Sequence, residues 1–126
     1  MIRQYKKSDY KDVMNMLEIE GEDGLMKKSL IYVLEEENKV MGFISFGALR
    51  GFPVLHQLCV SKDHRSMSNF RKLVRSFVKK TAWSAGIFLH AKKDYLNKFI
   101  QYYFKAKPYA EVDGVRWYFV EVTHES

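Results

Sequence analysis

Residues 54–80, with the sequence VLHQLCVSKDHRSMSNFRKLVRSFVKK, carry the most informative pattern in the chain. The first seven residues are mostly apolar, as expected for a strand that is covered on both faces. A polar loop follows over residues 61–66. Apolar side chains then recur at the i, i+3, i+4, i+7 and i+8 spacing of an amphipathic helix. They are Phe70, Leu73, Val74, Phe77 and Val78. The stretch therefore predicts a buried central strand that leads through a loop into a helix.

Similar patterns extend from this stretch to both ends of the chain. Strands are expected over residues 2–5, 31–36, 40–47, 54–60, 86–91 and 115–122. One helix is capped by Ser8 or Asp9 and ends near Gly21, and another is capped by Asp94 and stopped by Pro108. The turn at residues 37–39 joins its two neighbouring strands into an antiparallel hairpin. The expected order, β-α-β-β-β-α-β-α-β, predicts a mixed α/β fold.

Composition limits the class of protein. The 126 residues are 47% apolar and contain no repeat or linker, which predicts one folded domain over residues 1–126. No apolar run is long enough to span a membrane, and the first residues lack a signal-peptide core, so a cytoplasmic location is expected. One cysteine and four dispersed histidines predict no metal site. The net charge of +6 favours anionic partners, namely nucleic acid, a phosphorylated cofactor or an acidic protein.

Four stretches resemble the GCN5-related N-acetyltransferase (GNAT) family. Residues 2–13 are similar to its first strand and helix, and NKVMGFI at 38–44 is similar to its hairpin with a Val-x-Gly pattern. LCVSKDHR at 58–65 resembles the family's Leu-x-Val-x-Pro-x-x-Arg stretch, and YYFKAKPY at 102–109 resembles its late Phe-Tyr-x-x-x-Gly-Phe stretch. The resemblance implies a mostly antiparallel sheet flanked by helices. It also implies an N-acetyltransferase that uses acetyl-CoA and transfers the acetyl group directly to an amine in a ternary complex.

The resemblance further implies a cofactor-binding segment. In the family, the backbone of the central strand holds the acetyl group and pantetheine arm, and an Arg/Gln-x-x-Gly-x-Gly/Ala loop before a helix holds the pyrophosphate. The corresponding residues here are Leu58, Cys59, Val60, Arg65, Ser66, Met67, Ser68, Asn69 and Phe70. Ser68 and Phe70 replace the two glycines, which elsewhere allow a positive φ or close approach to a ligand. Phe70 either obstructs the pocket or, as its place in the helix stripe suggests, points into the core.

Two side chains are candidates for proton transfer. His56 lies on the central strand where one branch of the family has a histidine, and an imidazole suits a general base at neutral pH. The alternative is a structural, hydrogen-bonded histidine. Tyr103 is the candidate acid for the leaving thiolate, with Tyr102 as a substitute, although Tyr103 also fits a buried helix position. Cys59 is not expected to act as a nucleophile, because no adjacent cation lowers its pKa. Asn97 lies one residue away from a position where the family often has asparagine.

Three functions remain open at this point. The first is an acetyl-CoA-dependent N-acetyltransferase acting on an amine. The second is a non-catalytic interaction protein with the same fold, whose basic surface binds a protein or nucleic acid. The third is an enzyme that modifies nucleic acid. The cations of residues 71–80 either form a functional patch or merely solvate a helix. A homodimer is compatible with all three functions.

Overall fold

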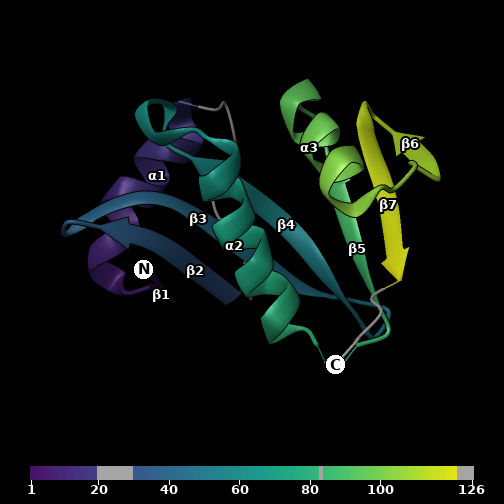
Figure 1. Cartoon of the computed structure of the whole chain (residues 1–126), viewed down its shortest axis with the longest axis horizontal. Coiled ribbons are helices and arrows are strands. Elements are labelled where there is room, and N and C mark those ends of the chain that lie inside the picture. The colour runs from purple at the N-terminus through teal and green to yellow at the C-terminus, as the bar shows by residue number, and fades with distance from the viewer. Residues whose placement is uncertain (20–29, 83, 122–126) are drawn as a thin grey trace. The chain divides into compact units, whose positions relative to one another are not determined.

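The computed structural model describes residues 1–19, 30–82 and 84–121, so the expected helix end near Gly21 and residue 122 of the last strand lie outside it. The elements are β1 (Ile2–Gln4), α1 (Tyr10–Ile19), β2 (Leu30–Glu36), β3 (Lys39–Leu49), β4 (Phe52–Val60), α2 (Met67–Lys80), β5 (Gly86–Ala91), α3 (Asp94–Phe104), β6 (Ala110–Val112) and β7 (Val115–Glu121) (Figure 1). Short 3-10 helices at Lys7–Asp9 and Lys62–His64 precede α1 and α2. The mixed α/β class is confirmed, and β6 is a strand that the sequence patterns did not predict.

The strands are hydrogen-bonded in the order β1-β2-β3-β4-β5-β7-β6. The pairs β1/β2, β2/β3, β5/β7 and β6/β7 are antiparallel, whereas β4 and β5 are parallel. The predicted hairpin is the β2/β3 pair, and its two turn residues, Glu37 and Asn38, both have positive φ, as a type I′ hairpin loop requires. No helix in the described parts of the chain is long and apolar enough to cross a membrane.

The chain divides into two compact units. The first comprises Met1–Gly47 and His56–Lys80, and the second comprises Ala48–Leu55 and Thr81–Ser126. Each unit is therefore considered by itself.

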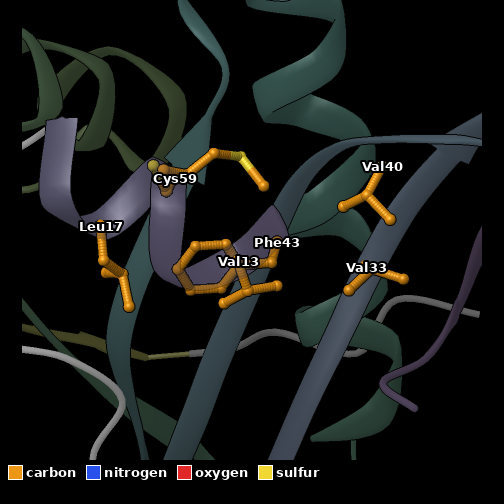
Figure 2. Close-up of a cluster of buried hydrophobic side chains, with 7 residues drawn as sticks. Val13, Leu17, Val33, Val40, Phe43 and Cys59 are labelled. Carbon is orange, nitrogen blue, oxygen red and sulfur yellow. The ribbon is translucent and has the colours of Figure 1, made fainter. Parts of the chain in front are cut away.

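In the first unit, α1 and α2 cover opposite faces of β2 and β3. On one face, Val13 and Leu17 of α1 pack with Val33, Phe43 and other buried residues (Figure 2). On the opposite face, the ring of Phe46 meets the ring of Phe77 of α2 edge-on, with 5.0 Å between centroids. Because side chains alternate along a strand, Phe43 and Phe46 necessarily point to different faces.

A β-bulge completes the core around α1. Leu34 pairs with Gly42 and the next residue, Glu35, pairs with Val40, so Met41 is an extra residue in β3. An extra residue shifts the alternation of side chains by one position. Val40 and Phe43 therefore both face α1, and both belong to the buried cluster of Figure 2.

In the second unit, α3 lies against β5 and β7. Its cap differs from the prediction, because Lys93 is the N-cap and Asp94 is the first helical residue. The helix ends at Phe104, before Pro108, and Lys105 takes a left-handed conformation with φ of 53°. A left-handed residue is a common way to end a helix, so the end is set by the backbone three residues before the proline.

Candidate functional site

His56 lies on β4 with its imidazole ring over Gly47 of β3. A Cβ atom added to Gly47 would lie 2.9 Å from Nε2 of His56, so the absence of a side chain at residue 47 makes room for the ring. The ring is half-buried, and desolvation lowers the pKa of His56 from its ordinary value of 6.5. His56 is therefore neutral at physiological pH, which is the protonation state that a general base needs.

The end of β4 is held tightly against β3. Leu58, Cys59 and Val60 are all buried. A Cβ atom added to Gly42 would lie 2.7 Å from the carbonyl oxygen of Cys59, so glycine is required for this approach of the two backbones. The side chain of Cys59 belongs to the apolar cluster beneath α1 (Figure 2), and its burial agrees with the expectation that it is not a nucleophile.

The loop between β4 and α2 is fixed by its own hydrogen bonds. The Ser61 amide donates to the carbonyl of Met41 at 2.8 Å, and Ser61 Oγ and His64 Nδ1 are 2.7 Å apart. Arg65 donates from Nη2 to the carbonyl of Val60 at 3.2 Å, and Asn69 donates from Nδ2 to the carbonyl of His64 at 2.6 Å. The guanidinium of Arg65 thus ties the loop back to the end of β4, a contact that sequence patterns could not predict.

Helix α2 begins with a capped turn. Ser66 is its N-cap, because its Oγ accepts the Asn69 amide at 3.1 Å and its carbonyl accepts the Phe70 amide at 3.1 Å. Met67 and Ser68 are exposed in this first turn, and their amides have no acceptor within the helix. No acidic residue occurs in this turn. The helix N-terminus therefore offers an anion the positive end of the helix dipole and two amides that have no acceptor within the helix.

The two positions that lack the family's glycines lie inside α2. Ser68 and Phe70 have helical backbone conformations, so neither position needs the positive φ that glycine allows. Phe70 is 6% exposed and packs in the core. The core alternative for Phe70 is therefore the correct one, and its ring does not lie across the first turn of α2.

A pocket of about 230 Å³ adjoins the end of β4 in the first unit. Its lining residues come from α1, the start of β3, the end of β4 and the following loop. They are Asp12, Asn15, Met16, Lys39, Val40, Cys59, Val60, Ser61, Lys62, Asp63 and His64. Among the described residues, no group of three potential ligands is placed to hold a metal ion.

The second unit contains Tyr103 and Asn97. Tyr103 is half-buried and stacks on Phe99 with 5.5 Å between centroids, whereas Tyr102 is exposed. The structure thus brings His56 together in one unit with the predicted cofactor-binding residues, while any approach of Tyr103 to them stays a prediction. Asn97 is 3% exposed and accepts a hydrogen bond from the hydroxyl of Tyr118 at 2.6 Å. The side chain of Asn97 therefore forms its hydrogen bonds within the second unit.

Comparison with known proteins gives matches to solved structures only. No family model matches the sequence, and no curated protein matches it. The chain is similar to aminoglycoside 6'-acetyltransferase type Ii, with 17% identity, a TM-score of 0.78, and coverage of 100% of this chain and 99% of the other. It is similar to a Desulfovibrio desulfuricans protein described as a GNAT-family acetyltransferase, with 13% identity, a TM-score of 0.76, and coverage of 98% and 99%.

A third match is N-acetylglutamate synthase from Neisseria gonorrhoeae, complexed with coenzyme A and N-acetyl-glutamate. The identity is 13% and the TM-score 0.80, and the match covers 98% of this chain and 35% of the synthase chain. At such identities, structural likeness establishes the fold and leaves the function open. The chain has the fold of the GCN5-related N-acetyltransferases.

Proposed function

We propose that this chain is an acetyl-CoA-dependent N-acetyltransferase that acts on an amine, with residues 1–126 working as one domain. The observation that carries the proposal is the junction of β4 and α2, where the exposed residues Met67 and Ser68 form the first turn of a capped helix that has no acidic residue in this turn. Solved acetyltransferases with this fold support it, and one of them is complexed with coenzyme A.

The residues of the junction fit a bound pyrophosphate. The amides of Met67 and Ser68 and the dipole of α2 would hold it, since those of Asn69 and Phe70 donate to Ser66, and Arg65 would add a positive charge beside them. Phe70 leaves the first turn open because its ring is buried in the core. The backbone of residues 58–60 would hold the pantetheine arm. Acetyl-CoA would supply the acetyl group as an activated thioester.

The proton transfers are assigned to two side chains. His56 is neutral near pH 7 because burial lowers its pKa, so it would accept the proton that the amine loses as it attacks the thioester carbonyl. Tyr103 would donate a proton to the departing thiolate, in keeping with the resemblance of residues 102–109 to the family's late stretch.

The test is a calorimetric titration of the purified protein with acetyl-CoA, using a variant that removes one amide. Met67→Pro deletes the first helical N–H, and proline is well tolerated at this position of a helix. Met67→Ala is the matched control, because it truncates the side chain and keeps the amide. We expect saturable binding that Met67→Pro weakens about tenfold, the effect of losing a hydrogen bond to a charged group.

Two other results would refute the proposal or its details. Equal affinities of Met67→Pro and Met67→Ala would show that the amide of Met67 does not hold the ligand. No binding at millimolar acetyl-CoA would contradict the enzyme proposal as a whole. It would favour the second candidate, a non-catalytic interaction protein that uses the basic surface of α2.

A further inference from the structure

A basic groove runs along the first unit where α2 crosses β1 and β2. Its volume is about 430 Å³, and it is lined by Ile2, Tyr32, Lys72, Arg75, Ser76, Lys79 and Lys80. We call this set of seven residues the basic groove. Four of them are cations, and none of these described residues carries a carboxylate. The groove therefore gathers four positive charges, with no carboxylate in its lining, in a chain whose net charge is +6.

The cations form a row on one side of α2. Lys72, Arg75 and Lys79 follow each other at i, i+3 and i+7, so they share a helix face and span about 10 Å along the axis. Among the residues that the structure describes, little acidic charge offsets them. Glu36 lies 3.9 Å from Lys72, but its Oε1 atom is closer, at 3.0 Å, to the N-terminal ammonium. An extended anion is the ligand that such a row of charges attracts.

The lining favours phosphates over an acidic protein. Every polar side chain in the basic groove, including the hydroxyl groups of Ser76 and Tyr32, can donate a hydrogen bond, which suits phosphate oxygens. Protein interfaces depend on apolar anchors at their centre. Here the apolar surface is limited to Ile2, the ring of Tyr32 and the stems of the long cations. Charge alone is sufficient for binding to a nucleic-acid backbone.

The lining also favours the backbone of a duplex over the bases of a single strand. Stacking of unpaired bases needs an accessible aromatic ring. The ring of Tyr32 already contacts the ammonium of Lys80, 4.8 Å from its centroid, and stacks on Phe46. We therefore propose that the basic groove binds the phosphodiester backbone of double-stranded nucleic acid without reading its sequence. This site is separate from the junction of β4 and α2 and does not depend on the proposed enzymatic activity.

The number of phosphates that the groove contacts sets the expected dependence of duplex affinity on salt concentration. A row of about 10 Å matches roughly three phosphates of one strand, since successive phosphates rise about 3.4 Å along the duplex axis. Three contacts give a slope of log affinity against log salt of about −2.7, so affinity falls roughly 40-fold between 50 mM and 200 mM salt.

The experiment measures the fluorescence anisotropy of a labelled 20-base-pair duplex titrated with the full chain at several salt concentrations. The test variant is Arg75→Gln with Lys79→Gln, and the control is Lys11→Gln with Lys98→Gln, two exposed lysines outside the groove. Both lower the net charge by two. We expect the groove variant to bind about tenfold more weakly or worse, with a salt slope smaller by about 2, and the control to stay within about twofold of the original chain.

Several outcomes would overturn the proposal. Equal losses in the two variants would mean that overall charge, and not the groove, attracts the duplex. An absence of binding at 50 mM salt would rule out the site. Displacement of the duplex by polyglutamate at equal charge would point to an acidic protein instead, and much tighter binding of a single strand would point to base stacking. Circular dichroism checks folding, and an unchanged acetyl-CoA titration of the groove variant separates this proposal from the enzymatic one.

Discussion

Replacement of Asn97 by alanine tests whether this residue is structural. Its Nδ2 atom donates to the carbonyls of Ala91 at 3.2 Å and Lys93 at 3.1 Å, and its Oδ1 atom accepts from the hydroxyl of Tyr118 at 2.6 Å. Asn97 is 3% exposed and Tyr118 is fully buried. The bonds therefore fasten the first turns of α3 to the end of β5 and to β7 in an environment that water does not reach.

The magnitude follows from these contacts. Loss of three hydrogen bonds costs about 1 kcal/mol each, and the buried Tyr118 hydroxyl, left with only the amide of Gln101, adds a further penalty of about 1 kcal/mol. Alanine offsets roughly 0.6 kcal/mol through its better helix propensity. We expect Asn97→Ala to lower the free energy of unfolding by about 3 kcal/mol.

The assay is urea unfolding followed by circular dichroism, combined with a double-mutant cycle. Tyr118→Phe removes the hydroxyl and keeps the ring, and it should cost about 1 to 2 kcal/mol by itself. The two effects should not add, since each variant removes the same bond, and we expect a coupling of at least about 1 kcal/mol. A loss below about 1 kcal/mol for Asn97→Ala, or additive effects, would refute this account. Weaker acetyl-CoA binding without loss of stability would instead assign Asn97 to the cofactor.

Three further predictions concern the first unit. Asp9 is buried, and hydrogen bonds from Arg3 are the chief reason that its pKa is lowered. The contribution of the Asp9 carboxylate to folding stability is therefore complete above pH 3.8 and is lost as the pH falls through the lowered pKa. Asp9→Asn should lower the free energy of unfolding by about 2 kcal/mol at pH 7 and should make stability depend less on pH in the acid range. Urea unfolding at several pH values measures both effects, and an unchanged pH dependence would contradict the role of the ion pair. Gly42→Ala should lower the free energy of unfolding by about 2 kcal/mol, because the added Cβ would meet the backbone of Cys59. Gly47→Ala should lower it by less, because the imidazole of His56 can turn away from the added Cβ. The reverse order of the two losses in urea unfolding would disprove both contacts. The rate of acetyl transfer should stay level through neutral pH and fall only below pH 6.5, because burial lowers the pKa of His56. His56→Gln should lower kcat at least about 100-fold. A pH–rate profile that is the same in His56→Gln as in the original chain would exclude His56 as the base.

The elements that could be predicted are those whose sequence period is long enough to be recognised. The stripe that begins at Phe70 runs for more than two turns, and it correctly predicted both α2 and the burial of Phe70. The hairpin was recognisable because two strand-like runs flank a short polar turn. By contrast, β6 is only three residues long, which is too short for alternation to distinguish it from a loop.

Contacts between distant segments were not predictable from local patterns. Asn97 lies one residue away from the position where the family often has asparagine, and nothing near it in the sequence reveals that its partner is Tyr118 on β7. In the basic groove, the sequence pattern reveals the cations that come from α2, whereas Tyr32 and Ile2 join the lining because α2 crosses β2 and β1. The hydrogen bond from Arg65 to the carbonyl of Val60 likewise depends on how the loop folds back.

The altered junction of β4 and α2 changes which groups could hold a phosphate. Residues 68 and 70 are helical here, so the loss of glycine costs no backbone strain and limits only how closely a ligand can approach. Arg65 donates one N–H to the carbonyl of Val60 and Ser66 Oγ is engaged as the cap, so the attraction comes from the amides, the dipole and a single cation. A duplex releases condensed counterions when the cations of the basic groove neutralise its phosphates, whereas hydrogen bonds from neutral amides release none. Acetyl-CoA binding at the junction should therefore depend weakly on salt and duplex binding in the groove strongly, so titrations of both ligands at two salt concentrations would distinguish the two sites on one unmodified protein.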